Sequence, residues 1–466
     1  MGGTSLIHGR IGSDSGVVMA WGAKDIRVER RGDAIIEAVV ATGSLVLRRI
    51  GGGRAGEVAA GRFLDHDDVT VTAIMATAAA RTIAAAKGRY VLAVQDTTEV
   101  NFKDRSARRT GLGPAGDGVS PGFFCHPLLL VDVESEAVLG LVHADIWTRE
   151  ETPVAPRASR AIADKESRRW LAATKVCAGV AEVAAKVVSA SDREGDIYEH
   201  FAACPANTEM IVRARHDRAT TTGTALFEMP AEFPLLGVAS VHVPPRGPGD
   251  KGRIAEVSIK AGRVEITRPK KLARSAGAPA TITLGLVEIA EVEPPAGKKP
   301  LCWRLLTTLP VGTLAQATEV ARLYRLRWRI EQLFRTLKSD GLDLEASQVT
   351  DARRLLKLAA FGLIGAARIM QLVDARDGSS RPATDVIDAA AIDVVAAIST
   401  SLEGKTLRQK NPHAKGSLAA VAWVVARLGG WNCYYKPPGP KTMSAGWPRL
   451  MDRLEGYALA TASKHV

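Results

Sequence analysis

The chain has 466 residues, of which 46% are hydrophobic and 24% charged, a composition typical of soluble globular proteins. No stretch approaches the roughly 18 uninterrupted apolar residues of a membrane span, and the N-terminus lacks a signal-peptide pattern. Lys and Arg number 62 against 50 Asp and Glu, and the net charge of +12 favours a polyanionic partner, most often nucleic acid. A basic enzyme that binds no nucleic acid is the alternative. Five scattered cysteines without a CxxC pair argue against a disulfide framework or zinc site and fit a reducing cytoplasm.

The first part of the chain is predicted to be helical. Helical periodicity covers residues 33–47 and 57–64, with a glycine-rich break at Gly51–Gly53 between them. An alanine-rich helix is expected over 73–86.

The pattern then changes to short apolar runs that are typical of buried strands. The first covers residues 89–95 and ends at Asp96. Further strands are expected over 127–133 and 137–145, joined by a hairpin turn. A helix over about 161–185 and a brief apolar run over 186–189 precede Asp192.

From residue 210 to about 306 the chain is β-rich and interrupted by Pro and Gly, with β-prone runs at 210–214, 238–243, 280–287 and 303–308. A long helix is expected over about 313–338, followed by helices with polar linkers at 374–382 and 405–415. This order predicts an α/β fold, with a mixed sheet, flanking helices and a β-rich insertion.

Asp96 and Asp192 each follow an apolar strand, where α/β enzymes often place functional groups. Each has a structural alternative. Asp96 could cap a turn with the threonines that follow it. Asp192 could be the N-cap of the next helix, with Asp196 in its first turn.

A polar stripe on the predicted helix 313–338 carries a third acid. At about 100° per residue, Tyr324, Arg327, Glu331 and Lys338 fall within a stripe roughly 60° wide, and Arg335 widens it to roughly 80°. A stripe facing the core would be apolar. The alternative is a solvated face, since Arg327 and Arg335 both lie four residues from Glu331.

These residue types suit chemistry at a DNA phosphodiester. Three carboxylates without His or Cys favour two Mg²⁺ ions, for which Mn²⁺ would substitute. Such a pair of ions stabilises charge on the attacking and leaving oxygens. Arg327, Lys338 and the Tyr324 hydroxyl would hold flanking phosphates.

The sequence resembles the DDE transposases of bacterial insertion sequences, in particular the insertion-sequence-four group. Asp96-Thr-Thr resembles the first acidic motif and Asp192-Arg-Glu-Gly-Asp the second. The group's spaced signature Tyr, Arg, Glu, Lys falls on Tyr324, Arg327, Glu331 and Lys338 without a gap. The resemblance covers roughly residues 30–460.

The resemblance implies a domain organisation and a reaction. Residues 71–372 would form a ribonuclease-H-like catalytic core, with the β-rich insertion at about 210–302. The N-terminal helical region 1–70 would bind the transposon ends, and the C-terminal helical region 373–466 would pair two subunits in a synaptic complex. Cut-and-paste transposition would proceed by a nick, a DNA hairpin, hairpin opening and attack of the 3′-hydroxyl on target DNA.

Three further residues gain roles from the resemblance alone. Trp303 resembles a tryptophan that accommodates a flipped base, and Trp328 one that supports the flipped strand end. Core packing is the alternative for both. Arg213 resembles an arginine near the cleaved strand, and with Arg335 it completes the residues expected to bind DNA.

The N-terminal part departs from the group's pattern. Arg31-Gly32-Asp33 has an altered order, Gly61-Arg62-Phe63 lacks the usual Tyr, and residues 1–22 match no known element. These departures leave open a catalytically decayed copy that regulates transposition by binding DNA or by dimerising. A separate alternative is a ribonuclease-H-like nuclease that cuts without strand transfer.

Overall fold

A computed structural model describes residues 20–102, 109–116, 118–149, 165–243, 252–270, 272, 277–338, 342–379, 381–434 and 436–462. The chain divides into two compact units. Unit 1 comprises residues 1–86, 97–153 and 329–466, and unit 2 comprises residues 87–96 and 154–328. Residues 1–19, most of the segment that matches no known element, lie outside the described residues.

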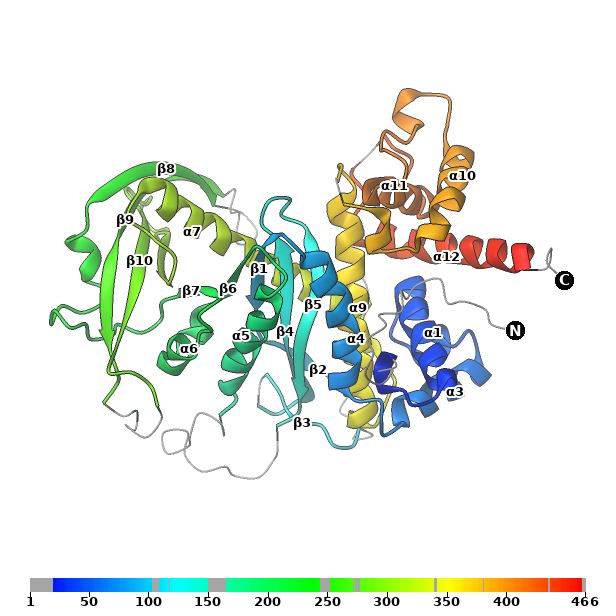
Figure 1. Cartoon of the computed structure of the whole chain (residues 1–466), viewed down its shortest axis with the longest axis horizontal. Coiled ribbons are helices and arrows are strands. Elements are labelled where there is room, and N and C mark those ends of the chain that lie inside the picture. Colours follow the sequence, from blue (N-terminus) through cyan, green and yellow to red (C-terminus); the bar gives the residue numbers. More distant parts are fainter. Residues whose placement is uncertain are drawn as a thin grey trace. The chain divides into compact units, whose positions relative to one another are not determined.

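Helices outnumber strands in the described part of unit 1 (Figure 1). They are α1 (Ile26–Thr42), α2 (Leu47–Ile50), α3 (Arg54–Asp65), α4 (Val71–Ala86), α8 (Trp328–Lys338, whose first residue belongs to unit 2), α9 (Ala352–Ala375), α10 (Ile392–Leu402), α11 (Leu418–Leu428) and α12 (Pro440–Ala462). The helices predicted at 57–64 and 73–86 are confirmed. The helix predicted at 33–47 is shifted. It begins at Ile26, where Asp25 accepts a hydrogen bond from the Arg27 N–H, and ends at Gly43, whose φ of 55° stops it.

The altered order Arg31-Gly32-Asp33 has a packing explanation. Trp21 is 2% exposed, and its indole Nε1 donates to Asp33 Oδ1 at 2.8 Å. A Cβ at Gly32 would come within 2.4 Å of the Trp21 ring, so only glycine fits there. The Trp21 ring also lies 5.2 Å from that of Phe361 on α9, which joins the N-terminal helices to the core of unit 1.

The strands described in unit 1 are β2 (Thr98–Asn101), β3 (Gly113–Pro114), β4 (Pro121–Asp132) and β5 (Val138–Trp147). β2, β3 and β5 each pair with β4 in antiparallel orientation. Helices α4 and α9 pack against β5. The hairpin predicted between β4 and β5 is confirmed, and Glu136 in its turn has a φ of 54°. Both strands of the hairpin extend beyond the predicted runs.

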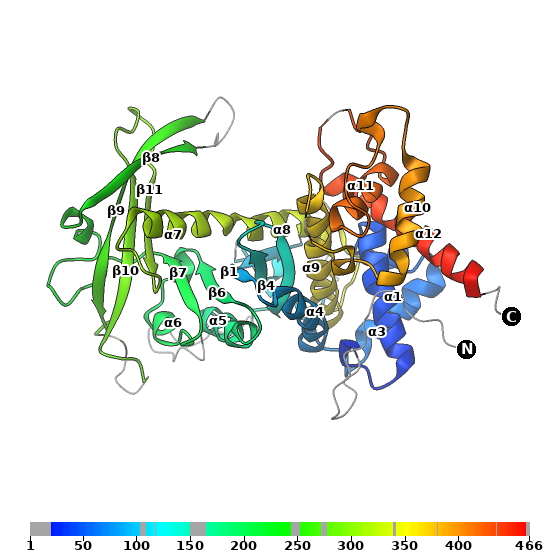
Figure 2. The same ribbon diagram turned by 45° about the horizontal axis from the view of Figure 1, so that its top comes forward.

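The described residues of unit 2 form seven strands and three α-helices. The strands, in their order across the sheet, are β1 (Tyr90–Gln95), β6 (Lys186–Ser191), β7 (Glu209–Arg213), β11 (Cys302–Thr307), β10 (Thr281–Glu291), β9 (Arg253–Thr267) and β8 (Leu235–Val243). The first three are parallel and the rest antiparallel. The helices are α5 (Arg168–Ala181), α6 (Tyr198–Ala202) and α7 (Leu314–Leu326), and α7 lies against β9, β10 and β11 (Figure 2). The predicted mixed α/β class is therefore confirmed.

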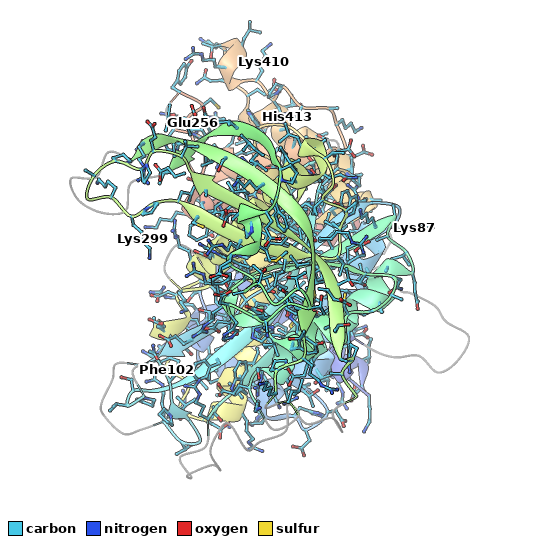
Figure 3. The ribbon with its side chains drawn as sticks, turned by 90° about the vertical axis from the view of Figure 1, so that its left-hand side faces the viewer. Lys87, Phe102, Glu256, Lys299, Lys410 and His413 are labelled. Atoms are coloured by element: carbon cyan, nitrogen blue, oxygen red, sulfur yellow. The ribbon has the colours of Figure 1, made fainter. Side chains whose placement is uncertain are left out.

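The β-rich part of unit 2 has one long strand that the sequence did not predict. β9 alternates buried and half-buried or exposed residues along most of its length, because only one face packs on the core. Figure 3 shows this part facing the viewer, with Glu256 on β9 and Lys299 in the segment before β11. A buried cluster that includes Met210, Leu286 and Leu306 joins β7, β10 and β11.

Three other predictions need correction. The helix expected over 313–338 is two helices, because α7 ends at Leu326 and α8 begins at Trp328. The helix expected over 161–185 begins at Arg168, with residues 161–164 outside the described part. The predicted polar linker 374–382 is wrong at its ends, because Asp374 and Arg381 are buried and ion-paired.

Helix α9 is long and apolar enough to cross a membrane by length and composition, but 78% of its apolar window is buried within the protein. Core helices of soluble proteins have the same character. All five cysteines lie in the described part and are free.

Candidate active site

Three polar residues lie side by side at one edge of the sheet of unit 2. β1 and β6 pair with Val94 opposite Ala190, and the same register continued by two residues places Asp96 opposite Asp192. β6 and β7 pair with Ser191 opposite Val212, which places Asp192 beside Arg213. Adjacent strands are about 4.8 Å apart, so the carboxyl ends of three parallel strands bring two acids and one base together.

Helix α7 adds aromatic and basic groups to this edge. Arg327, the residue that caps α7, places Nη1 at 2.9 Å from Asp96 Oδ2. Its guanidinium lies 5.7 Å from the centre of the Tyr324 ring. The Tyr324 ring in turn meets that of Trp303 edge-to-face, with centres 5.6 Å apart. Asp96, Arg327, Tyr324 and Trp303 therefore form one contact network within unit 2.

Guanidinium groups surround the Tyr324 phenol. Burial raises the pKa of Tyr324, and the positive charges of Arg327 and Arg213 oppose that rise, while the charge of Asp192 adds to it. Burial also lowers the pKa of Arg213, as do the charges of Arg193 and Arg327. Arg193, Arg213 and Arg327 lie close enough to interact electrostatically, and such a cluster of positive charge favours an anion such as a phosphate.

The structure confirms that Asp192 caps the turn that follows it, and its role as a metal ligand stays a prediction. Its carboxylate accepts a hydrogen bond from Glu194 N at 2.8 Å and so caps the turn Arg193–Gly195. The cap uses Oδ1, and it also holds the side chain at the end of β6. A capped aspartate at this edge is positioned rather than mobile, which suits a metal ligand.

The sequence suggested that Asp196 lies in the first turn of a helix, but the structure does not place it there. It is 2% exposed, and its carboxylate pairs with Arg218 Nη2 at 2.6 Å. Its second oxygen accepts from Arg215 N at 2.7 Å and His216 N at 2.8 Å. Asp196 therefore ties the turn after β6 to the segment after β7.

A buried polar network lies behind the two aspartates. Gln95 Nε2 donates to Thr174 Oγ1 at 2.7 Å and to Ser189 Oγ at 3.1 Å. Thr174 Oγ1 lies 2.7 Å from His200 Nε2, and His200 Nδ1 lies 2.8 Å from Gly195 O. Since a carbonyl only accepts, Nδ1 donates and Nε2 accepts the threonine proton. The network connects the residue before Asp96 with the turn that follows Asp192.

Glu331, Arg335 and Lys338 lie on α8 in unit 1. Glu331 is half-buried in the first turn of the helix and Arg335 is exposed. Lys338 is half-buried, and its charge acts on the Cys125 thiol, whose pKa burial raises to about 12. The apolar residues Ile330, Leu333 and Leu337 are fully buried on another face, as the periodicity predicted.

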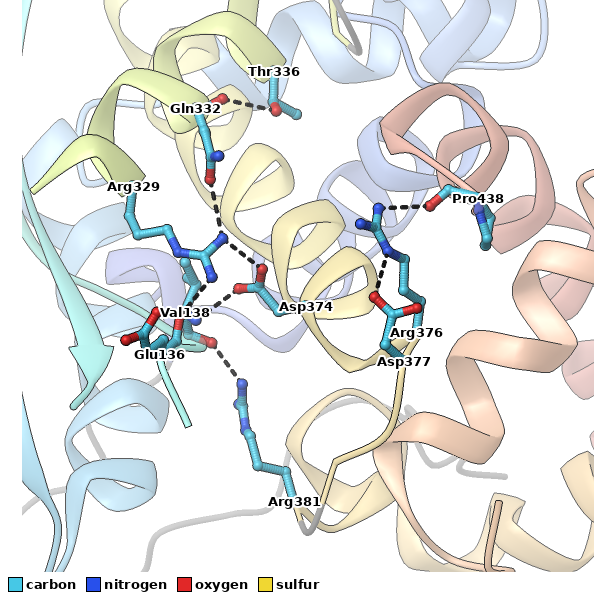
Figure 4. Close-up of polar contacts among 10 residues, drawn as sticks. All are labelled: Glu136, Val138, Arg329, Gln332, Thr336, Asp374, Arg376, Asp377, Arg381 and Pro438. Atoms are coloured by element: carbon cyan, nitrogen blue, oxygen red, sulfur yellow. Dashed lines mark hydrogen bonds and ion pairs between the residues drawn. The ribbon is translucent and has the colours of Figure 1, made fainter. Parts of the chain in front are cut away.

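Arg329 anchors the first turn of α8 (Figure 4). Its guanidinium donates to Asp374 Oδ1 and to Glu136 O, each at 2.8 Å, and to Gln332 Oε1 at 3.1 Å. Asp374 Oδ2 also accepts from Val138 N at 2.9 Å. Helix α8 is therefore fixed, two residues before Glu331, to the β4–β5 hairpin and to the end of α9.

Trp328 is 56% exposed, which excludes its core-packing alternative. Trp303 is half-buried at the start of β11, beside the edge that carries Arg213. The structure thus places six predicted residues within unit 2 around one sheet edge or on α7: Asp96, Asp192, Arg213, Trp303, Tyr324 and Arg327.

The donor chemistry at this edge fits a hard divalent cation. Asp96 and Asp192 offer carboxylate oxygens from neighbouring strands, and no His or Cys is predicted to join them. Among the described residues, no three His, Cys, Asp or Glu side chains are already grouped to hold a metal ion. In unit 2 the positive charge beside Asp96 comes from Arg327.

Residues 193–364 match the family model described as the transposase DDE domain. The match supports a DDE transposase family. Proteins of this family carry out nucleolytic and transposition chemistry on DNA, generally with divalent metals. The matched segment begins directly after Asp192 and contains Glu331, so it covers the third predicted acid but neither of the first two.

Sequence reasoning missed several residues that support this candidate site. Arg193 is the second residue of the Asp192 motif, and its position beside the acid was the available signal. His200 and Arg329 carried no local signal, since each acts through partners distant in sequence.

Proposed function

We propose that the protein is a cut-and-paste DNA transposase of the insertion-sequence-four group, with a ribonuclease-H-like catalytic core. The observation that carries the proposal is the placement of Asp96 and Asp192 on neighbouring strand ends with Arg327 and Tyr324 beside them. The DDE family match over the segment that contains Glu331 supports it independently.

In this proposal Asp96, Asp192 and Glu331 hold two Mg²⁺ ions, for which Mn²⁺ substitutes. When bound, the ions stabilise the charge that develops on the attacking and leaving oxygens of a phosphodiester. Glu331 follows Arg327 by four residues, which is the spacing of the family signature.

The remaining residues bind and orient the DNA strand. Arg327, Lys338 and Arg335 contact phosphates, and the Tyr324 hydroxyl donates to a phosphate oxygen. Trp303 and Trp328 stack against a base that leaves the duplex, and an exposed Trp328 is available for that contact. Arg213 lies near the cleaved strand.

The proposed reaction starts when water hydrolyses one strand and frees a 3′-hydroxyl. That hydroxyl attacks the opposite strand to form a hairpin, a second water opens the hairpin, and the same hydroxyl then attacks target DNA. Residues 1–70 bind the transposon ends, and residues 373–466 pair two subunits as a homodimer in the synaptic complex.

A catalytically decayed copy is the second candidate, because Arg327 already pairs with Asp96. Such a protein would bind DNA or dimerise with an active relative without cutting. The ion pair would then be a permanent replacement for a metal ion.

A cleavage assay separates these candidates. Linear DNA carrying the element's inverted ends is incubated with Mg²⁺ and wild-type protein, Glu331→Gln, or Glu345→Gln, a matched change at an exposed glutamate. Hairpin-ended product from wild type and Glu345→Gln, but not from Glu331→Gln, is the expected result. Retained DNA binding without any wild-type cleavage would indicate the decayed copy, and cut ends without hairpin or joined product would indicate a simple nuclease.

A further inference from the structure

The loop between α10 and α11 is strongly basic and projects an apolar side chain. This basic loop, residues 403–417, carries Lys405, Arg408, Lys410, His413 and Lys415. Its single acidic residue is Glu403, at its start. Lys405, Arg408 and Lys410 are exposed. Leu407 stands among them with 88% of its surface exposed. Figure 3 labels Lys410 and His413 on this loop.

Hydrogen bonds hold the basic loop in one conformation. Thr406 Oγ1 lies 2.7 Å from the Tyr434 hydroxyl, and Gly404 N donates to Gln409 O at 3.1 Å. Asn411 Nδ2 donates to Ser399 Oγ at 3.0 Å and to Ala420 O at 3.3 Å. The turn Leu407–Gln409 is therefore pinned on both sides.

A pinned turn that exposes a leucine between cations has the features of a preformed binding surface. Single exposed leucines are common, but here every charged residue from Lys405 to Lys415 is basic or histidine. Proteins that bind duplex DNA combine phosphate contacts by Lys and Arg with apolar side chains placed against or between bases in the minor groove. Because the loop conformation is already fixed, little ordering cost opposes such binding.

We propose that the basic loop is a docking surface for double-stranded DNA of any sequence. Lys405, Arg408 and Lys410 contact phosphates, and Leu407 packs against the sugar and base edges of the minor groove. Within the proposed function this duplex is the target DNA, and that assignment rests on the proposed function. The duplex binding itself does not depend on catalysis.

The test measures binding of full-length protein to a duplex of unrelated sequence without transposon ends. Fluorescence anisotropy gives the affinity over a range of KCl concentrations. Lys405→Gln/Arg408→Gln/Lys410→Gln removes three charges at exposed positions. The charge-matched control is Lys87→Gln/Lys175→Gln/Lys299→Gln, also at exposed positions. The loop variant is expected to bind about tenfold more weakly or worse, with a salt slope lower by about one per lost contact. The control is expected to keep the wild-type slope.

Leu407→Ala tests the apolar contact separately. It is expected to weaken binding about three- to tenfold without a change in salt slope, whereas Ile254→Ala, a change at a leucine-sized side chain that is 76% exposed, leaves binding unchanged. Wild-type affinity and slope in the loop triple variant would overturn the proposal. So would loss of self-association, measured by sedimentation, with unchanged DNA binding, because the loop would then contact a second copy.

End cleavage in Mg²⁺ keeps this proposal distinct from the proposed function. The loop variants are expected to nick transposon ends as wild type does and to lose target joining. If wild-type protein cuts nothing, the proposed function fails, while the duplex-binding comparison still decides the role of the loop.

Discussion

Arg327 and Asp96 form an ion pair at 2.9 Å between residues that are 231 positions apart in sequence. Both side chains are largely buried, with 14% and 16% of their surfaces exposed. A guanidinium thus occupies one side of a carboxylate that is proposed to bind metal. A cation at Asp96 and a phosphate near Arg327 would compete with this pair, which couples DNA binding to metal binding.

The first prediction concerns this competition. Arg327→Gln should bind Mn²⁺ more tightly in the absence of DNA, because no guanidinium competes for Asp96. A competing interaction of about 1 kcal/mol corresponds to roughly fivefold tighter binding. The same variant should cleave DNA more slowly, because it lacks a phosphate contact. Titration calorimetry with Mn²⁺ and a cleavage time course measure the two effects.

Arg322→Gln is the matched control, since Arg322 pairs at 2.8 Å with Glu319 on α7. It should change neither Mn²⁺ affinity nor cleavage. Equal Mn²⁺ affinity of wild type and Arg327→Gln would mean that the Arg327–Asp96 pair does not compete with metal.

The second prediction separates two roles of Asp192. Asp192→Asn keeps a side-chain oxygen that can accept from Glu194 N, so the cap and the melting temperature should be nearly unchanged. The negative charge needed by a metal ligand is lost, and cleavage should fall by at least about a thousandfold. Thermal unfolding and single-turnover cleavage are the two measurements.

For Asp196→Asn, in contrast, we expect a loss of stability. It breaks a buried pair with Arg218 and should lower the free energy of unfolding by about 3 kcal/mol. A stable Asp192→Asn protein that still cleaves DNA would remove Asp192 from the proposed metal site.

The positions of both aspartates at strand ends could be predicted from the sequence, because apolar runs of strand length end directly before each acid. The helical stripe was predictable in part. Its apolar face is buried as expected, but the break after Leu326 was not foreseen, since no Gly or Pro marks it.

The supporting contacts could not be predicted because their partners are distant in sequence. Asp374 was predicted to lie in a polar linker. Its burial could not be foreseen, because the cation that compensates its charge, Arg329, is 45 residues away in sequence. β9 was missed because Gly262 and Arg263, neither of which is buried, interrupt the alternation of buried and unburied residues. The three regions expected along the chain, 1–70, 71–372 and 373–466, stay a prediction.

The third prediction concerns the Arg329–Asp374 pair (Figure 4). Arg329→Ala leaves Asp374, whose side chain is 6% exposed, without its cationic partner. Loss of one partner of a buried pair should lower the free energy of unfolding by about 3–5 kcal/mol. Chemical denaturation measures the loss. Arg353→Ala is the control, because Arg353 is 77% exposed and should change stability by less than about 0.5 kcal/mol. A loss below about 1 kcal/mol in Arg329→Ala would show that α8 does not depend on this anchor.

The fourth prediction is a pH dependence of stability that arises from His200. Burial lowers the pKa of His200 from its usual 6.5 to about 4. Between these two values the unfolded chain binds a proton that the folded chain does not, so the free energy of unfolding must fall as the pH drops from about 6.5 toward 4. The shift corresponds to a loss of about 3 kcal/mol across the window.

His200→Gln removes this titration but keeps a side chain that can donate to Gly195 O and accept from Thr174. Urea unfolding at pH 5 and pH 7.5 should therefore show a smaller difference for His200→Gln than for wild type, even if the variant is less stable at both. The contribution of the carboxylates to the pH dependence of stability cancels in this comparison, because they titrate alike in the two proteins. Equal differences would mean that His200 is not held neutral behind the two aspartates, and that the network from Gln95 to Gly195 has another proton arrangement.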